Sequence, residues 1–389
     1  MLSELFKPIK LGTMLVPNRF VRSATNESLT DKKDYVTDRL ADFYEALARG
    51  SVGLIITGYA YVRQDGKSST SQAAIYDDKF IPAYKTVIER LRPYPIRIVL
   101  QIAHGGRQSI PAACDSKPIA PSPVPYPLTK LTPREMTEED IQEITHSFAR
   151  AARRAREAGF HGVQLHAAHG YLLSQFISPF TNRRKDKWGG SVENRARIIL
   201  EILKACRKEV GKEFPILIKL NSDDCIEGGL KVEEAVRIAS MLGQAGIDAV
   251  EVSGGIGDSF PSACRPDIKS MKEEAYFANN AQKIKEALEG TFGKGGLGSP
   301  DPKKTADQSA SDGCLCPVIC VGGIRSREVM ESIISTGKAD MVSMSRPFIR
   351  EPDLVEKIRK GLTDRAACIS CNQCWHPRGI RCAQLGTRD

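Results

Sequence analysis

The 389-residue sequence has no long hydrophobic run and no block of like charges. A membrane-spanning helix needs about 20 consecutive apolar residues, and no uninterrupted apolar run approaches that length, so we expect no membrane partner. The 56 basic and 47 acidic residues are interspersed without five like charges in a row. Despite a formal charge of +9, this pattern predicts a mild attraction for anionic ligands such as phosphates and no nucleic-acid partner.

The sequence also lacks a secretory signal and a cysteine pattern typical of disulfides, and both features bear on the cellular compartment. The segment after Met1, SELFKPIK, lacks the basic start and the apolar core of a secretory signal. The eleven cysteines are odd in number and scattered until the C-terminus, which favours free thiols in a reducing environment over a disulfide framework. We therefore expect a cytoplasmic protein.

Short β-rich runs alternate with longer helical segments along most of the chain. Most of these runs are almost continuously apolar, such as GLIITGYAYV and RIVLQIAH, which is typical of strands covered by helices on both faces. The eight expected strands are Arg19 to Thr25, Gly53 to Tyr61, Ile96 to Ala103, Gly162 to Ala167, Pro215 to Asn221, Ala249 to Ser253, Val318 to Val321 and Ala339 to Met344.

Helical patterns fill the intervals between these strands. The expected helices are Thr37 to Ala48, Ile81 to Leu91, Glu139 to Ala158, Glu193 to Val210, Val232 to Ala245, Ala275 to Leu288, Arg327 to Thr336 and Leu354 to Lys360. The third has Thr137 and Asp140 before and at its start, in the spacing of a capping box. Eight strand-helix units predict an α/β fold, a single (β/α)8 TIM barrel. A doubly wound open sheet is the alternative, but it more often has fewer strands and a glycine fingerprint after the first.

Three segments fall outside this repeat. Pro8 to Pro17 reads as an N-terminal hairpin with Gly12 in the turn, placed as a plug at the lower end of the barrel. Thr291 to Gly313 is polar and rich in Gly, Pro and Ser, which predicts a mobile insertion. The tail after Arg365 carries the cysteine cluster. We therefore expect a barrel over 1–365 and a short Cys-rich tail over 366–389.

The segment from Gln164 to Arg195 joins the fourth expected strand to a group of proton-carrying side chains. His166 and His169 flank two alanines, and Tyr171 follows two residues later. Such a group predicts chemistry on a carbonyl or another anionic oxygen. Zinc binding by the two histidines is an alternative, but HAAH lacks the glutamate of the helical HExxH motif.

Polar and small residues recur at the ends of the other strands, where TIM barrels build their active sites. Glycine amides and one arginine after the last two strands predict a phosphate site. The residues taken forward from these strand ends are Ser23, Ala24, Thr25, Asn26, Gly58, Gln101, Lys219, Gly322, Gly323, Ser345 and Arg346.

This set of residues resembles the Old Yellow Enzyme family of FMN-dependent ene-reductases. The resemblance rests mainly on HAAHGYLLSQFISPFTNRR and WGGSVENR, supported by PNRFVRSAT, LQIAHGGRQ and ADMVSMSRPFIREPDL, and it runs from the first strand to the eighth. It implies a barrel that holds FMN over its C-terminal mouth. It also implies reduction of that FMN by NADH or NADPH, followed by reduction of an activated C=C bond.

The resemblance assigns a role to each position. His166 and His169 would bind the substrate carbonyl oxygen, and Tyr171 would protonate the α-carbon. Lys219 aligns with the basic residue at flavin N1 and O2, where a fixed cation favours the anionic reduced flavin. Asn26 stands where some relatives have Cys or Thr, and it is counted with the substrate contacts. The remaining flavin contacts would be Ser23, Ala24, Thr25, Gly58 and Gln101 at the ring, and Gly322, Gly323, Ser345 and Arg346 at the phosphate.

The tail cysteines leave three alternatives open. Cys368, Cys371, Cys374 and Cys382 have the spacing C-x2-C-x2-C-x7-C, which could hold one metal centre. CISCNQC is similar to the first three [4Fe-4S] ligands of the dienoyl-CoA reductase and trimethylamine dehydrogenase branches, but the last gap is shorter here. An iron-sulfur cluster, zinc and a metal-free tail are the three alternatives.

The sequence thus predicts an FMN-dependent NAD(P)H oxidoreductase that reduces an enone, enoate or enoyl thioester. One alternative is an iron-sulfur and FMN enoyl- or dienoyl-CoA-type reductase fed by a partner protein. Another is a zinc-stabilised binding module without turnover, which the full set of strand-end residues argues against. We also expect a homo-oligomer.

Overall fold

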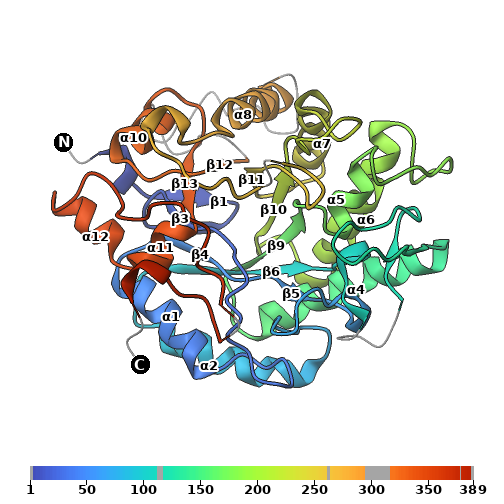
Figure 1. Cartoon of the computed structure of the whole chain (residues 1–389), viewed down its shortest axis with the longest axis horizontal. Coiled ribbons are helices and arrows are strands. Elements are labelled where there is room, and N and C mark those ends of the chain that lie inside the picture. The colour runs from blue at the N-terminus through green and yellow to red at the C-terminus, as the bar shows by residue number, and fades with distance from the viewer. Residues whose placement is uncertain (1–2, 112–116, 261–262, 294–315, 377, 387–389) are drawn as a thin grey trace, which may run out of the picture.

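The computed structural model describes residues 3–111, 117–260, 263–293, 316–376 and 378–386, so most of the segment expected as an insertion, 291–313, lies outside the described residues. Within these ranges, eight parallel strands form a closed ring, because the order β4, β3, β13, β12, β11, β10, β9, β6 is completed by a pairing of β4 with β6. Figure 1 shows these strands at the centre with the helices around them. The expected (β/α)8 barrel is confirmed.

The barrel strands are short, and each helix returns the chain to the start of the next strand. The strands are β3 (Phe20–Arg22), β4 (Leu54–Ile56), β6 (Arg97–Ala103), β9 (Gly162–Ala167), β10 (Ile216–Asn221), β11 (Ala249–Ser253), β12 (Val318–Val321) and β13 (Met341–Met344). The helices are α1 (Asp38–Arg49), α2 (Ile81–Leu91), α4 (Glu138–Glu157), α6 (Val192–Val210), α7 (Val232–Gln244), α8 (Ala278–Gly293), α10 (Arg327–Ser335) and α12 (Leu354–Arg359).

Two short helices and a break in one strand differ from the expectation. Helices α5 (Leu172–Ile177) and α11 (Arg346–Arg350) follow β9 and β13 directly. The expected second strand is interrupted after β4 and resumes as β5 (Ala60–Tyr61), since the Gly58 N–H turns to the Glu27 carboxylate at 2.9 Å. Helix α8 begins at Ala278 because Ala275 adopts a positive φ of 54°, which a helix does not accommodate.

Helix α4 shows why the amphipathic pattern folds as expected. Thr137 accepts a hydrogen bond from the Asp140 N–H, and the Asp140 side chain accepts one from the Thr137 N–H, so the capping box is confirmed. Ile141, Ile144 and Phe148 are fully buried on one face against the sheet.

The interior of the barrel has two layers, because residues two apart on a strand face the same side. The lower layer is apolar and includes Val21, Val99 and Leu217. The upper layer comes from the residues two positions later in the chain and includes Gln101 on β6, Lys219 on β10 and Ser23, which directly follows β3. Each of these segments therefore contributes one side chain to the core and one to the polar layer above it.

The N-terminal hairpin closes the lower end of the barrel. Strands β1 (Ile9–Leu11) and β2 (Met14–Val16) pair antiparallel around Gly12, which has a φ of 57°. Leu11, Met14 and Val16 belong to the same apolar cluster as the lower layer, so the expected plug is confirmed. No helix in the described ranges combines the length and the apolar character needed to cross a bilayer.

Candidate active site

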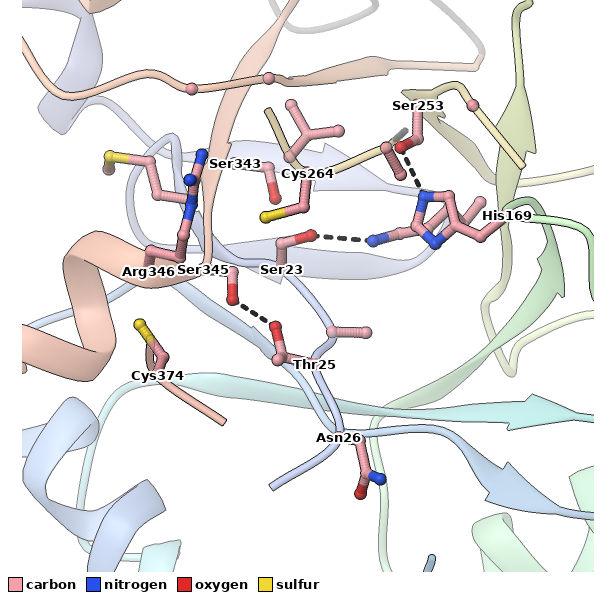
Figure 2. A pocket seen from close by; sticks show the side chains of 18 of the residues that line it. Ser23, Thr25, Asn26, His169, Ser253, Cys264, Ser343, Ser345, Arg346 and Cys374 are labelled. Carbon is pink, nitrogen blue, oxygen red and sulfur yellow. Dashed lines mark hydrogen bonds between the residues drawn. The ribbon is translucent and has the colours of Figure 1, made fainter. Parts of the chain in front are cut away.

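A cavity of about 550 Å³ lies at the C-terminal ends of the strands, above the polar layer. In Figure 2, Arg346 and Cys374 lie on one side of this pocket and His169 on the other, with Ser23 between them. The lining residues expected from the sequence are Ser23, Ala24, Thr25, Asn26, Gln101, His166, His169, Tyr171, Lys219, Gly322, Gly323, Ser345 and Arg346. The structure thus brings together residues from strands that are far apart in the sequence.

The floor of the cavity is a buried hydrogen-bonded group centred on Glu251. Its carboxylate accepts hydrogen bonds from Ser23 and Ser343, both at 2.7 Å, and from the Gln164 amide at 2.9 Å. Lys219 Nζ lies 3.2 Å from the same carboxylate and donates to Ser23 Oγ at 2.8 Å. All polar atoms of this buried carboxylate are therefore satisfied.

The charges of this pair depend on each other. Burial opposes ionisation of Glu251, but Lys219 and the hydrogen bonds from its neighbours outweigh that effect and lower the pKa of the carboxyl. Burial lowers the pKa of Lys219, and Glu251 opposes this shift. Lys219 therefore places a cation at the floor of the cavity, and the Glu251 carboxylate balances its charge.

His166 and His169 stand side by side on the cavity wall, with ring centroids 5.3 Å apart. The Ala168 N–H donates to His166 Nδ1 at 3.3 Å, so the neutral ring carries its proton on Nε2. His169 Nε2 shares a hydrogen bond of 2.8 Å with Ser253 Oγ. Burial, with the nearby His169 and Lys219, holds the pKa of His166 well below its ordinary value. Burial and Lys219 lower the pKa of His169 to about 3, so both rings are neutral at pH 7.

The turn that carries these residues is strained and braced. His169 has a φ of 61° and donates its N–H to Asn221 Oδ1 at 3.0 Å. The buried Gln175 of α5 donates its amide to Gly170 O at 2.7 Å and to Gly105 O at 3.1 Å. This brace fixes the loop after β9 to the loop after β6.

Tyr171 precedes α5 and places its phenol beside His166, with a centroid distance of 4.8 Å. Its hydroxyl hydrogen-bonds the Tyr59 hydroxyl at 3.0 Å. Burial raises the pKa of Tyr171 well above its ordinary value, and the nearby Tyr59 adds to this shift. The phenol therefore keeps its proton at neutral pH.

The opposite end of the cavity combines glycines with arginine. Gly322 and Gly323 have φ values of 134° and 69°, and a Cβ at Gly323 would lie 2.9 Å from the Tyr276 ring. The Ser345 hydroxyl hydrogen-bonds Thr25, and Arg346 Nη1 donates to Asn372 Oδ1 at 2.6 Å and to Arg265 O at 2.9 Å. The two glycines carry no side chain of their own and pack against the Tyr276 ring, and with Arg346 they form a corner that suits a phosphate.

The tail folds over this corner, and its cysteines gather there. Burial, with the neighbouring thiols of Cys368, Cys382 and Cys371, raises the pKa of Cys374 to about 12, and of the four only Cys374 lines the cavity. Among the described residues, however, no three His, Cys, Asp or Glu side chains are placed to hold a metal ion. In this arrangement the four thiols do not form a preformed metal site.

Comparison with known proteins identifies the family. The family model described as NADH:flavin oxidoreductase / NADH oxidase matches residues 4–316 and 301–365. The chain belongs to this family. Its members named NADH oxidase, from Thermoanaerobacter brockii, and metal reductase, from Desulforamulus reducens, are 38% and 33% identical over 95% and 96% of the chain. The chain spans only about half of their length, 53% and 51%.

Solved structures of the family agree. A 2-naphthoyl-CoA reductase in complex with 2-naphthoyl-CoA has a TM-score of 0.84 and 31% identity, covering 95% of this chain and 54% of that one. Morphinone reductase has a TM-score of 0.73 and 26% identity, covering 93% and 91%. Membership of this family, which includes the Old Yellow Enzymes, implies FMN as cofactor and NADH or NADPH as reductant.

The cavity fits the flavin of this family. It offers a buried cation below, unsubstituted glycine backbone and an arginine at one end, and a volume of about 550 Å³. The buried Nε atoms of Arg265 and Arg325 have no hydrogen-bond partner among the described residues, and Arg325 lines the cavity. An anionic group in this corner would lie beside the Arg325 guanidinium, whose Nε is 3.7 Å from the Glu274 carboxylate and whose other two nitrogens donate to the Cys368 and Ile268 carbonyls.

One expected flavin contact differs, and several lining residues were not foreseen. Gly58 is absent from the lining, because its N–H is bonded to Glu27 and a Cβ there would overlap the Glu27 carboxylate. Its neighbour Tyr59 lines the cavity instead, and a tyrosine directly after the Thr57-Gly58 strand end was the available signal. Other lining residues missed in the sequence include Cys264, Tyr276, Arg325, Ser343, Asn372 and Trp375, which lie mostly in irregular segments.

Proposed function

We propose that this protein is an FMN-dependent NAD(P)H reductase of activated C=C bonds in α,β-unsaturated carbonyl compounds. The observation that carries this proposal is the placement of two neutral imidazoles and one protonated phenol on a single cavity wall, from His166, His169 and Tyr171. Imidazole N–H groups suit a carbonyl oxygen, and a neighbouring phenol suits protonation of carbon.

The residues divide the reaction between them. When FMN is bound, it supplies the hydride for the β-carbon of the substrate. His166 and His169 hold the carbonyl oxygen, with the His166 proton available on Nε2, and stabilise the negative charge that develops there. Tyr171 then gives its proton to the α-carbon as a general acid. Because both imidazoles are uncharged, they donate hydrogen bonds without protonating the oxygen themselves.

The cofactor would lie between the floor and the phosphate corner. Lys219 would meet the flavin ring at its electron-rich edge and favour the reduced anion. Ser23, Ala24, Thr25 and Gln101 would border the ring. Gly322, Gly323, Ser345 and Arg346 would hold the phosphate through backbone amides and a guanidinium. Asn26 lines the cavity near Tyr59 and would contact the substrate.

The decisive experiment is an anaerobic visible spectrum. The purified yellow protein should lose its flavin absorbance when NADH or NADPH is added and regain it when cyclohexenone is added. A preparation without flavin after gentle purification contradicts the proposal, as does a reduced flavin that no enone, enoate or enoyl thioester reoxidises.

Replacing Tyr171 by Phe tests the proton donor. We expect the enone half-reaction to slow by about 10²- to 10⁴-fold, the usual contribution of a general acid, while flavin reduction by NAD(P)H is nearly unchanged. Tyr84→Phe is the matched control, since the buried Tyr84 hydroxyl has no hydrogen-bond partner among the described residues. Equal losses in both half-reactions of Tyr171→Phe would remove its role as acid.

The second candidate is an iron-sulfur and FMN enoyl- or dienoyl-CoA-type reductase that receives electrons from a partner protein. It is favoured by the gathering of Cys368, Cys371 and Cys382 around Cys374 and by the 31% identity to the 2-naphthoyl-CoA reductase. Metal analysis should then find about four irons per chain, with broad absorbance near roughly 400 nm. Zinc or no metal would favour the first proposal, in which 366–389 is a metal-free or zinc-bound tail.

A further inference from the structure

A second phenol stands behind the proposed proton donor. Tyr59 lines the cavity, its hydroxyl lies 3.0 Å from that of Tyr171, and the two rings are 5.0 Å apart. Within the described ranges, neither phenol has a carboxylate or an amine as hydrogen-bond partner. The two hydroxyls can therefore exchange donor and acceptor roles by rotation of their O–H bonds.

An ionised Tyr171 would be unfavourable in this position. Burial raises the pKa of Tyr171 and also that of Tyr59. After Tyr171 gives up its proton, the phenolate must be neutralised before the next turnover. His166, His169 and Tyr126 also carry protons near it, but burial keeps both imidazoles neutral and raises the pKa of Tyr126, and each imidazole has one ring nitrogen already hydrogen-bonded.

Tyr59 leads from Tyr171 toward solvent. The polar side chains of Ser68 and Asn26 lie beside its hydroxyl, which hydrogen-bonds Tyr171, and Ser68 also lies beside Tyr171. Tyr59, Tyr171 and Ser68 are all partly buried, but Tyr59 and Tyr171 line the cavity, whereas Ser68 is not among the residues that line it. Gln72 holds this arrangement, because its Oε1 accepts the Ser68 N–H at 2.7 Å and the Ser68 hydroxyl at 3.2 Å, while its amide donates to the Tyr59 carbonyl at 3.3 Å.

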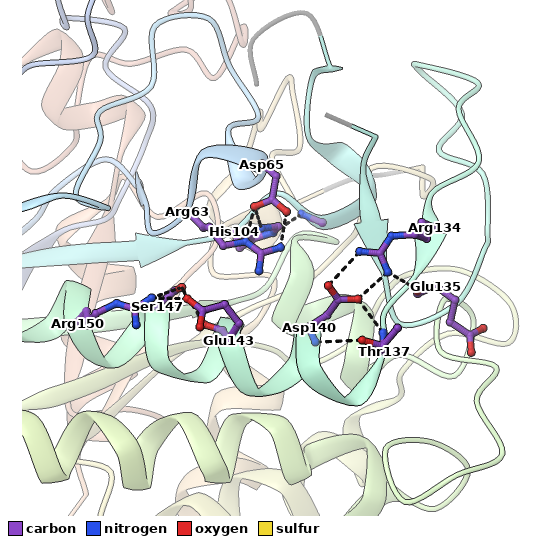
Figure 3. A network of polar contacts seen from close by, with 11 residues as sticks. Arg63, Asp65, His104, Arg134, Glu135, Thr137, Asp140, Glu143, Ser147 and Arg150 are labelled. Atoms are coloured by element: carbon purple, nitrogen blue, oxygen red, sulfur yellow. Dashed lines mark hydrogen bonds and ion pairs between the residues drawn. The ribbon is translucent and has the colours of Figure 1, made fainter. Parts of the chain in front are cut away.

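The loop that carries Ser68 is anchored by a buried imidazole. His104 Nδ1 accepts the Gly106 N–H at 3.1 Å, so Nε2 carries the proton and donates to Asp65 at 3.1 Å. Figure 3 shows the Asp65 carboxylate hydrogen-bonded to both Arg63 and His104. Burial opposes ionisation of Asp65, but these two partners hold its pKa below the ordinary value. A Gly105 N–H to Gly66 O bond of 2.8 Å joins the two loops again.

We propose that Tyr59 and Ser68 form a proton relay that reprotonates Tyr171 from solvent after each turnover. This inference rests on the proposed ene-reductase function. The Tyr171 O–H bond breaks as the α-carbon gains its C–H bond. The Tyr171 oxygen then takes the Tyr59 proton, the Ser68 hydroxyl rotates away from Gln72 and gives its proton to Tyr59, and Ser68 takes one from water. One solvent proton is consumed per product, and the relay moves no electrons.

Tyr59→Phe tests the relay while keeping the aromatic ring that packs against Tyr171. In the flavin-loaded enzyme, we expect kcat for enone reduction to fall about tenfold, less than the loss of a general acid itself. KM for the enone and the rate of flavin reduction by NAD(P)H should be nearly unchanged. Imidazole buffer, a small external acid, should restore turnover in proportion to its concentration. A purely structural role for Tyr59 would show no such rescue.

Two further variants make the result specific. Ser68→Ala interrupts the relay at its outer end. Because Tyr59 and Ser68 act in series, the double variant Tyr59→Phe/Ser68→Ala should have the same kcat as Tyr59→Phe alone. Tyr84→Phe, which removes a buried hydroxyl elsewhere, should turn over like the unmodified enzyme. The relay is overturned if Tyr59→Phe keeps the kcat of the unmodified enzyme or if imidazole does not restore its loss. Failure of the unmodified enzyme to reduce any enone would instead contradict the proposed function.

Discussion

The two histidines of the cavity wall must stay neutral to bind a carbonyl oxygen as the proposal requires. Their neutrality is a consequence of burial beside Lys219, and it connects the site to the stability of the fold. Burial and Lys219 lower the pKa of His169 to about 3, below the value of about 6.5 expected for an unfolded chain. Between these values the unfolded protein binds a proton that the folded protein does not.

The folded protein should therefore become less stable as the pH is lowered through that window. Because the unfolded state binds more protons, the free energy of unfolding decreases as pH falls below about 6.5, by up to about 1.4 kcal/mol per pH unit for each such histidine. His169→Asn should show a shallower decrease between about pH 6 and pH 4, measured by urea unfolding of the purified flavoprotein. Equal slopes for the two proteins would show that His169 is protonated in the folded state.

The six-residue helix α5 holds two loops of the site together through one side chain, Gln175. Gln175 is fully buried and joins the turn after β9 to the loop after β6 through both ends of its amide, with Oε1 accepting the Arg107 N–H at 3.1 Å. No hydrophobic side chain of similar size can make these bonds. The position of Tyr171 relative to the cavity thus depends on one amide.

Gln175→Leu should be strongly destabilising and should displace the catalytic turn. Several buried backbone groups would lose their partner, at about 1–3 kcal/mol each, and kcat for enone reduction should fall more than KM rises. Gln282→Leu is the control, because in the described part of the chain the Gln282 amide donates to Glu286 on the same outer helix, α8, and braces no loop. Unfolding midpoints and steady-state kinetics measure both effects. Unchanged kinetics in Gln175→Leu would show that the turn holds without this brace.

The elements also show what the sequence could predict. The eight strands were recognisable because burial on both faces produces continuous apolar runs, such as RIVLQIA in β6. Helix α5 was not, since six residues are too few for a periodic pattern. The break after β4 depends on Glu27, which is distant in sequence from Gly58 and gives no local signal. The site residues at strand ends could be predicted from the barrel topology. Tyr276 and Trp375 could not, because they lie in irregular segments that have no periodic sequence pattern.

On the scale of the whole molecule, the barrel is closed differently at its two ends. The lower end is sealed by the apolar hairpin, whose turn packs against Asp248. The upper end is bordered by the tail, where Asn372 contacts Arg346 and the Ile380 N–H donates to Glu27 O at 2.7 Å. We expect changes at the lower end to affect stability and changes at the upper end to affect flavin binding.

Gly12→Ala tests the lower closure. Gly12 has a φ of 57°, and a Cβ there would overlap the Asp248 side chain, so backbone strain and a steric clash add together. Gly337→Ala is the control, with a φ of 72° and nothing within 4 Å of the added Cβ. Gly337→Ala should cost about 1 kcal/mol from backbone strain alone, and Gly12→Ala distinctly more, by urea unfolding. Flavin reduction kinetics should be unchanged in both. Equal losses of stability would show that the hairpin shifts freely.

The two layers inside the barrel have a consequence for how such a protein can change over time. Val21 and Ser23, or Leu217 and Lys219, lie two residues apart in the chain but are under different selective pressures. Val21 and Leu217 are constrained by packing in the core, whereas Ser23 and Lys219 are constrained by what the cavity binds. A lineage can therefore replace the upper set and acquire a new substrate while inheriting the lower set intact. Laboratory libraries confined to the upper positions should accordingly retain a high fraction of folded members.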